Sequence, residues 1–572
     1  MSKPTPRSSH SFPSPTAEPS TDPSVLLLAS GLSESEVARI LAPYGFRQPA
    51  KADANLQSIA GEPRTRKLLA IFIADLLDEV SQTADPDQAL MHWEEYVRVA
   101  MNRTQLLEYV GRVPRMRHLL CTVFGNSPSF SATLIRDPSL IYWLAEEPVL
   151  TQPPNRREWE QHIRTAVSNF SVSELKLDAV RRIRRREMLR LGVRDLLRLS
   201  TVEETITDLS DLAGVLVQVI YEVVLEELHS TYGRPMHRDR QGCLVETGFV
   251  VMAMGKLGGR ELNFSSDIDL IYVYAEEEGS TVLPRSRKNR EATAIQNEEF
   301  FEYLSRELTK ALSDVTQEGY VFRVDLRLRA EGAVGQLARS IRGYRQYYQD
   351  RGQDWERLSL LKAWPLAGDH AVGRAFLRMV QPFVFGKKSQ TVDLAEGVRL
   401  VNQVKAVKDM IDIKMAARGH GQRNVKLGVG GIREIEFIVQ VIQALCGGRL
   451  ARLRDRATLS GLEKFRRLGL VTDMQTRQLR EAYVFLRDVE HKLQMVHDLQ
   501  THALPDTEEE MHRCAVRMGY HGDGRLTALE QFTADLVCHT KNVNQAFRAL
   551  FDAPERSPVL HAALAVVKTA AR

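Results

Sequence analysis

The chain has 572 residues, of which 43% are hydrophobic and 26% are charged, and its formal net charge at pH 7 is only +4. This length exceeds what one hydrophobic core organises, so we expect several globular domains, and the near-neutral charge gives no reason to expect a nucleic-acid partner. No apolar run is long enough to cross a bilayer. Five scattered cysteines without metal-ligand spacing indicate reduced thiols in a cytoplasmic protein.

Helical periodicity dominates the first part of the chain. Residues 1–24 are rich in Ser, Pro and Thr and are expected to form a disordered tail. From 25 to 235 apolar positions recur every three or four residues, as in 65–80 and 180–199, which predicts an N-terminal helical region. The arginine run within 181–186 is interpreted as a solvated helix face, the alternative being a surface that binds phosphate groups.

The pattern then changes to that of a small α/β domain, expected to span 236–380. The apolar, β-branched segment 243–255 predicts a buried strand, 267–274 predicts a second strand and 320–329 a third. A helix is predicted around 294–315, between the second strand and the third. Strand, turn, strand, helix and strand in this order are typical of a compact α/β domain.

The remainder of the chain returns to a helical pattern. Long amphipathic runs predict a C-terminal helical bundle over 381–555, with helices at 391–417, 432–446, 474–499 and 526–551. Residues 556–572 are expected to form a tail. The fold class predicted for the whole chain is therefore α+β and mostly helical, with the α/β domain flanked by two helical regions.

Two aspartates on the second predicted strand form the centre of the candidate site. Asp267 and Asp269 lie two residues apart, so their carboxylates project from the same face of the strand. Carboxylates this close repel each other unless a cation lies between them, and hard oxygen ligands suit Mg²⁺ or Mn²⁺. The alternative is a pair of solvated turn carboxylates, which the apolar neighbours Ile268 and Leu270 make the weaker interpretation.

The third predicted strand adds a carboxylate and several arginines. Asp325 alternates with apolar residues and would complete a three-carboxylate metal site with Asp267 and Asp269. Arg327 and Arg329 alternate on the same face, where their guanidinium groups could hold phosphate oxygens. The alternative is an amphipathic edge strand whose Arg–Asp ion pairs face water.

The polar turn before the aspartates is a candidate phosphate cradle. It lacks the residues of a Walker loop and the G-x-G-x-x-G pattern of a dinucleotide fingerprint. Backbone amides at Gly258 and Gly259, with the hydroxyls of Ser265 and Ser266, could nevertheless surround a phosphate, and Lys256 lies in the same turn. A tight turn that binds no ligand is the alternative.

Several strings resemble one enzyme family. The segment GKLGGRELNFSSDIDLIYVY (255–274) resembles the bifunctional glutamine synthetase adenylyltransferase/adenylyl-removing enzymes, which belong to the DNA-polymerase-β-type nucleotidyltransferase superfamily. Further segments resemble the same family: FRVDLRLR (322–329), DWERLSLLKA (354–363) and VKLGVGGIREIEFIVQ (425–440). The strings SSDIDL and GGIREIEF are similar to the half of these enzymes that removes AMP.

The resemblance implies a function. It implies that glutamine synthetase is the protein substrate and that inorganic phosphate removes AMP from its tyrosine to give ADP, with ATP-dependent attachment of AMP as the alternative. It also implies that the loop and helix carrying Arg433 and Glu436 close over the active site; a bundle helix with an internal ion pair is the alternative. Because Trp364 stands where the family has arginine, a catalytically silent module that binds glutamine synthetase or a PII-type signalling protein stays open.

Overall fold

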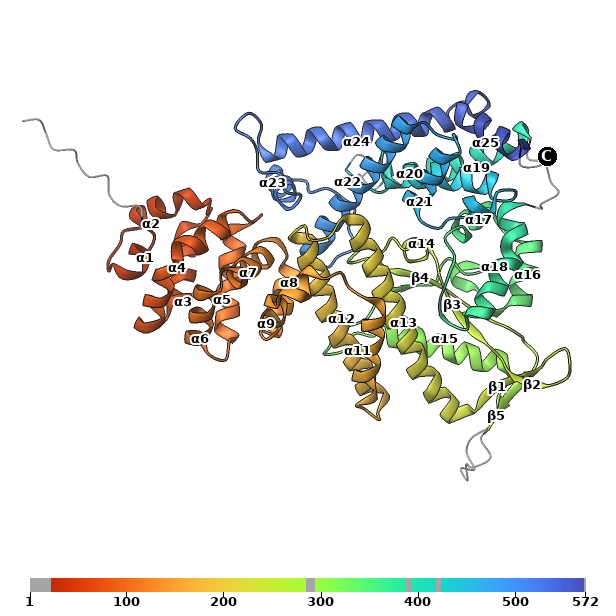
Figure 1. Ribbon diagram of the computed structural model, residues 1–572, viewed down its shortest axis with the longest axis horizontal. Helices are drawn as coiled ribbons and strands as arrows, with labels where there is room; N and C mark the ends of the chain where they lie inside the picture. Colours follow the sequence, from red (N-terminus) through yellow and green to blue (C-terminus); the bar gives the residue numbers. More distant parts are fainter. Residues whose placement is uncertain (1–21, 284–293, 387–392, 418–422, 570–572) are drawn as a thin grey trace, which may run out of the picture. The chain divides into compact units, whose positions relative to one another are not determined.

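The computed structural model describes residues 22–283, 294–386, 393–417 and 423–569. It is mostly helical with small β-sheets, which confirms the predicted α+β class (Figure 1). Contacts divide the chain into two compact units, Met1–Cys121 and Thr122–Arg572. This boundary falls inside the predicted helical region 25–235, so the later helices of that region belong to the same unit as the sheet.

Helices form the regular structure of the first unit. Proline stands in the first turn of α3, α4 and α5, where its fixed φ suits the start of a helix. Helix α4 confirms the helix predicted over 65–80, whereas residues 1–21 of the predicted tail lie outside the described residues. The helices are α1 (Val25–Leu28), α2 (Glu34–Leu41), α3 (Pro49–Ala60), α4 (Pro63–Ser81), α5 (Pro86–Val99), α6 (Arg103–Arg112) and α7 (Pro114–Asn126), which crosses into the second unit.

The main sheet of the second unit is organised around β3 (Phe249–Ala253). This strand pairs antiparallel with β4 (Ile268–Tyr274) and with β8 (Trp364–Gly368). On its other edge β4 pairs in parallel with β6 (Val324–Asp325) and β7 (Ala338–Ser340). A second sheet has the order β2-β1-β5, with β1 (Arg234–Arg238), β2 (Leu244–Glu246) and β5 (Ser280–Val282).

Both faces of the main sheet are buried by apolar side chains. On one face Phe249 stacks with Tyr221 of α13 (Val202–Tyr232) and Phe301 of α15 (Asn297–Ser313). On the other face Val250 and Met252 belong to a core shared with α16 (Ile341–Asp350), α18 (His370–Phe385) and the C-terminal helices. This explains why every residue of β3 is buried and why its sequence is continuously apolar instead of alternating.

Two predictions for the strands are corrected by the structure. The segment 243–255 is not one strand, because β2 and β3 lie in different sheets. The segment 320–329 contains only the two-residue strand β6, because the Arg329 side chain turns back and donates to the carbonyl oxygens of Leu326, Ala333 and Gly335 at 2.8–3.0 Å. The predicted helix around 294–315 is confirmed as α15.

The arginine run of 181–186 is not a solvated face. It lies on α12 (Ser173–Leu196), where Arg181 is buried beside Asp178, and Arg185 pairs with Glu318 at 2.9 Å. The guanidinium of Arg184 lies over the Tyr320 ring. The run therefore holds α12 against the segment before β6. The other helices of this part are α8 (Pro128–Arg136), α9 (Leu140–Ala145), α10 (Glu147–Thr151) and α11 (Arg156–Ser168).

The predicted C-terminal helices are confirmed, but the predicted tail is wrong. Residues 556–572 contain α25 (Pro558–Thr569), which contacts α19 and α20 and buries Leu560 and Leu564. Helix α24 contacts α22 (Figure 1). The helices from the sheet onward are α14 (Gly255–Gly258), α16 (Ile341–Asp350), α17 (Asp354–Leu360), α18 (His370–Phe385), α19 (Leu394–Ala417), α20 (Ile432–Cys446), α21 (Thr458–Arg467), α22 (Asp473–His497), α23 (Glu508–Arg517) and α24 (Ala528–Phe551).

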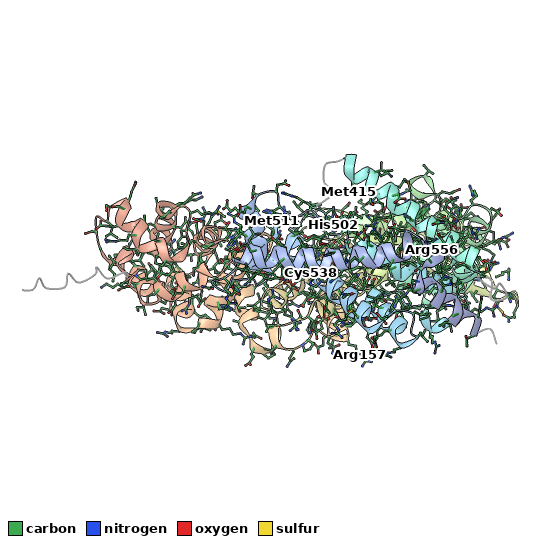
Figure 2. The ribbon with its side chains drawn as sticks, turned by 90° about the horizontal axis from the view of Figure 1, so that it is seen from above. Arg157, Met415, His502, Met511, Cys538 and Arg556 are labelled. Carbon is green, nitrogen blue, oxygen red and sulfur yellow. The ribbon has the colours of Figure 1, made fainter. Side chains whose placement is uncertain are left out.

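The cysteines carry free thiols. Cys121, Cys446 and Cys514 are buried, whereas Cys243 and Cys538 are exposed, the latter on α24 (Figure 2). Burial raises the pKa of the Cys446 thiol to about 12, so this side chain packs as an apolar group. Within the described residues no helix is long and apolar enough to span a bilayer.

Candidate active site

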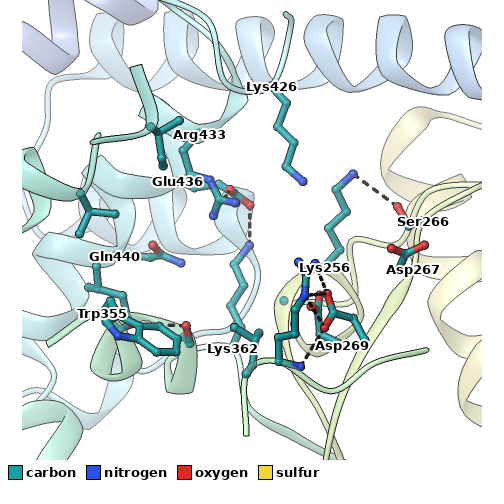
Figure 3. A pocket seen from close by; sticks show the side chains of 18 of the residues that line it. Lys256, Ser266, Asp267, Asp269, Trp355, Lys362, Lys426, Arg433, Glu436 and Gln440 are labelled. Atoms are coloured by element: carbon teal, nitrogen blue, oxygen red, sulfur yellow. Dashed lines mark hydrogen bonds and ion pairs between the residues drawn. The ribbon is translucent and has the colours of Figure 1, made fainter. Parts of the chain in front are cut away.

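A cavity of about 400 Å³ collects most of the predicted site residues (Figure 3). Its walls are formed by the turn at α14, the starts of β4 and β6, and helices α17, α19 and α20. The predicted residues that line it are Lys256, Ser266, Asp267, Asp269, Asp325, Arg327, Arg433 and Glu436. Segments far apart in the sequence therefore meet at one site.

The central feature of the cavity is a pair of carboxylates on neighbouring strands. Asp269 and Asp325 are register partners in the parallel β4–β6 ladder, so they project from the same side of the sheet. Burial and the negative charge of Asp325 raise the pKa of Asp269 to about 6. Gly255, with φ of +54°, lies so close that a Cβ built there would be 2.1 Å from Asp269 Oδ2. A glycine is therefore required where the turn meets this carboxylate.

The other two carboxylates are turned toward arginines. Arg323 Nε donates to Asp267 Oδ1 at 2.7 Å, and Arg327 Nη2 donates to Asp325 Oδ2 at 2.5 Å. Burial alone would raise the pKa of Asp325, but the hydrogen bonds from Arg327 lower it below its ordinary value. In this arrangement no group of three acidic, histidine or cysteine side chains among the described residues is placed to hold a metal ion.

The donor chemistry nevertheless fits a hard divalent cation. Asp267, Asp269 and Asp325 offer carboxylate oxygens to one cavity, which are the ligands that Mg²⁺ takes in proteins. In the described part of the chain Asp269 forms no ion pair, and its raised pKa records a repulsion that a bound cation would relieve. Rotation of Asp267 and Asp325 away from their arginines would add the remaining oxygens.

Lys426 and Arg433 add positive charge to the same cavity, near enough to Asp269 to act on its pKa. Lys426, which precedes α20, points into the cavity in Figure 3, and no ion pair of Lys426 occurs among the described residues. Burial lowers the pKa of Lys426, and the neighbouring Arg433 guanidinium lowers it further. Arg433 itself lies 3.4 Å from Glu436. Lys426 and Arg433 therefore place positive charge where phosphate oxygens would lie.

Two further lysines of the cavity are held by buried glutamates. Lys256 Nζ lies 2.7 Å from Glu490, a fully buried residue of α22. Lys362 Nζ lies 2.8 Å from both Glu261 and Glu436. Glu436 thus binds a lysine and an arginine of the protein, which accounts for its position without a nucleotide contact.

Four predicted phosphate ligands lie elsewhere. The amide of Gly258 donates to Met254 O at 2.8 Å and that of Gly259 donates to Gly255 O at 3.1 Å, so both are used within the turn. The hydroxyl of Ser265 donates to Asp498 and faces a different cavity. Arg329 is buried on backbone carbonyls, as described above. Of the residues predicted to surround a phosphate in this turn, Lys256 and Ser266 line the cavity.

Sequence reasoning missed two lysines of this cavity. Lys362 follows the helix α17 and Lys426 belongs to the glycine-containing loop before α20. Both lie in strings used for the family resemblance, but neither stands in a local pattern that marks a ligand. Only the folded contacts bring them to within reach of the carboxylates.

Comparisons with known proteins agree with this geometry. Residues 117–379 match the family model described as glutamate-ammonia ligase adenylyltransferase. This part of the chain is similar to the members of that family. Residues 405–551 match a second model, described as GlnD PII-uridylyltransferase.

Curated relatives of the adenylyltransferase family cover most of this chain. A bifunctional glutamine synthetase adenylyltransferase/adenylyl-removing enzyme of Pseudomonas syringae pv. tomato is 36% identical over 76% of this chain and 42% of its own length. The enzymes of the same name from Thioalkalivibrio sulfidiphilus and Hahella chejuensis are 36% and 37% identical, over 76% and 70% of this chain. The chain spans 42% and 40% of the lengths of these two relatives.

The one departure from the family strings lies outside the cavity. Trp364 begins β8, and the guanidinium groups of Arg456 and Arg260 lie 4.9 and 6.0 Å from its ring. It does not belong to the residues that line the site. The Trp364 ring therefore lies beside two arginines and outside the lining of the cavity.

The raised pKa of Asp269 makes the stability of the metal-free protein depend on pH. The folded protein binds the proton of the Asp269 carboxyl more tightly than the unfolded chain does. The protonated carboxyl therefore stabilises the fold below its unfolded pKa of 3.8, and this stabilisation is lost as the pH rises through about 6. We expect Asp269→Asn to raise the melting temperature in EDTA more at about pH 7.5 than at about pH 4.5. A difference that does not change between these pH values would contradict the electrostatic environment described for Asp269.

Proposed function

We propose that this chain is a metal-dependent nucleotidyltransferase that removes AMP from the adenylylated tyrosine of glutamine synthetase by phosphorolysis, giving ADP. The observation that carries the proposal is the cross-strand pair of Asp269 and Asp325, which faces the cations Lys426 and Arg433 in one cavity. The names of the relatives supply the protein substrate and the nucleotidyl group. The free thiols of the cysteines support a cytoplasmic location.

The residues of the cavity have separate tasks in this proposal. Asp267, Asp269 and Asp325 would hold Mg²⁺, or Mn²⁺ in its place, which when bound supplies neutralisation of charge at the α-phosphorus and its leaving oxygen. Lys426 and Arg433 bind phosphate oxygens and orient the phosphate that attacks. Phosphate is already an anionic nucleophile, so no side chain needs to act as a general base.

The direction of the reaction is proposed from the resemblance of SSDIDL and GGIREIEF to the AMP-removing half of the family. The metal and phosphate chemistry also serves attachment of AMP from ATP, which is the second candidate. The match of residues 405–551 to a PII-uridylyltransferase model supports a PII-type protein as a further partner. The chain spans less than half the length of the relatives it matches.

Two parallel assays test the proposal. With adenylylated glutamine synthetase, inorganic phosphate and Mg²⁺, the purified chain is expected to release the nucleotide as ADP, and EDTA is expected to stop the release. With unmodified glutamine synthetase and ATP it is expected to attach little or no AMP. Attachment without release would reverse the proposed direction, and binding of glutamine synthetase with neither reaction would indicate the silent module.

A further inference from the structure

The end of the cavity away from the carboxylates is apolar. Trp355, the second residue of α17, is 39% exposed although it is one of the largest apolar side chains of the protein. Figure 3 shows Trp355 on the side of the cavity opposite Asp267 and Asp269, with Lys362 between them. The apolar side chains that line the cavity come from four elements or loops: Leu328, Trp355, Leu358, Val407, Ile411 and Phe437. A surface of this kind fits a flat, uncharged part of a ligand.

Ser359 of α17 and Gln440 of α20 add polar groups to this lining, and the Ser359 hydroxyl donates to Trp355 O. Gln440 of α20 is only 6% exposed and lines the cavity. Among the described residues its side-chain amide makes no hydrogen bond, and Figure 3 shows the amide directed into the cavity. This amide is open to the cavity and offers it both an acceptor oxygen and two N–H donors. Gln440 therefore calls for a ligand with an adjacent donor and acceptor.

We propose that Trp355 and Gln440 form the adenine subsite of this cavity. In this arrangement the indole of Trp355 stacks on the base, and the Gln440 amide accepts from the N6 amino group while donating to N7. The phosphate end of the nucleotide then lies toward Lys426 and the carboxylates. The inference rests on the proposed function and adds to it the selectivity for the base.

The hydrogen-bonding edge favours adenine over guanine. Adenine presents a donor and an acceptor side by side at N6 and N7, which one amide satisfies in full. Guanine presents two acceptors at O6 and N7, so the carbonyl oxygen of Gln440 would face an acceptor. A tyrosine ring of a protein substrate would suit the Trp355 face but would leave the Gln440 amide without its acceptor–donor pair. The Gln440 side chain therefore decides between these occupants.

Nucleotide binding to the full chain tests the subsite. Dissociation constants for ATP, GTP and tripolyphosphate are measured by calorimetry in Mg²⁺ buffer. We expect the wild-type protein to prefer ATP to GTP, and Trp355→Ala to weaken ATP binding on the order of tenfold while tripolyphosphate binding stays unchanged. Gln440→Leu is expected to bring the ATP and GTP constants together. The matched control is Trp143→Ala, because Trp143 is half-buried against Arg186, outside the cavity.

The outcomes separate this inference from the proposed function. Equal losses for ATP and tripolyphosphate in Trp355→Ala, or an unchanged ATP preference in Gln440→Leu, would overturn the subsite. Trp355→Phe keeps a stacking ring and is expected to keep most of the ATP affinity. This variant therefore shows whether the loss in Trp355→Ala comes from the missing ring or from misfolding. A wild-type protein that releases nucleotide from glutamine synthetase but does not distinguish ATP from GTP would overturn the subsite alone. Adenine-selective binding without any transfer reaction would overturn the proposed function alone.

Discussion

Asp269→Asn is expected to lower phosphate-dependent release of AMP by about a thousandfold or more, the size of effect that loss of several kcal/mol of charge stabilisation produces. Asparagine has the same shape as aspartate but carries no negative charge. In the wild-type protein the charge of Asp269 is opposed by burial and by Asp325, so its removal relieves a repulsion and should not unfold the chain. Release of ADP from adenylylated glutamine synthetase and the melting temperature in EDTA are measured on the same preparations.

A lower rate of ADP release together with a higher melting temperature in Asp269→Asn would show that Asp269 serves the reaction and not the fold. Asp473→Asn is the matched control, because this aspartate side chain is 79% exposed at the start of α22. The control is expected to keep the wild-type rate. If Asp269→Asn keeps a rate near that of the wild-type protein, the carboxylate pair is not the reaction centre. A large fall in melting temperature would instead show that Asp269 supports the fold.

The centre of the site could be predicted from local sequence. Asp269 lies on a strand whose apolar neighbours specify its burial, Asp267 directly precedes that strand, and Asp325 lies in a second segment of alternating character. Parallel pairing of β4 with β6 then makes Asp269 and Asp325 neighbours. A period of two and β-branched residues are local features of the sequence, and they are enough to predict these strands.

The limits of the third strand and of the cradle could not be predicted in this way. Arg329 belongs to a regular alternation, yet its guanidinium is bound by carbonyl oxygens of the following loop, and no local pattern reports that contact. Gly258 looks like a free phosphate-binding amide until the helical turn of α14 uses it. The position of Lys426 depends on the packing of α20 against helices such as α17 and α22. Helix α25 is different, because apolar residues such as Leu560 and Leu564 recur at helical spacing and could have been recognised.

A second large effect is expected from Lys362→Met, in this case on stability. Lys362 is 6% exposed, and the two glutamates that it joins, Glu261 and Glu436, are 2% and 5% exposed. Loss of the ammonium group leaves two carboxylates buried without it, which costs about 3–5 kcal/mol for a buried pair that loses one partner. The free energy of unfolding by denaturant, measured near neutral pH, gives the size of the loss.

The loss in Lys362→Met should also depend on pH. Burial would raise the pKa of Glu436, but the Lys362 ammonium holds that pKa well below its ordinary value in the wild-type protein. This carboxylate therefore stabilises the fold above its unfolded pKa of 4.5, and that stabilisation is lost only as pH falls through the lower, folded pKa. In Lys362→Met this stabilisation by the Glu436 carboxylate is already absent. The difference in free energy of unfolding between the wild-type protein and the variant should therefore narrow as the pH is lowered below 4.5.

Lys405→Met is the control for this prediction. Lys405 pairs with Asp552 at 3.0 Å, but the two side chains are 34% and 44% exposed. Solvent screens such a pair, so its loss should change the free energy of unfolding by about 1 kcal/mol or less at any pH. If Lys362→Met costs no more than this control, Lys362 is not what holds Glu261 and Glu436 together. The link from the turn at α14 to α20 would then depend on apolar packing alone.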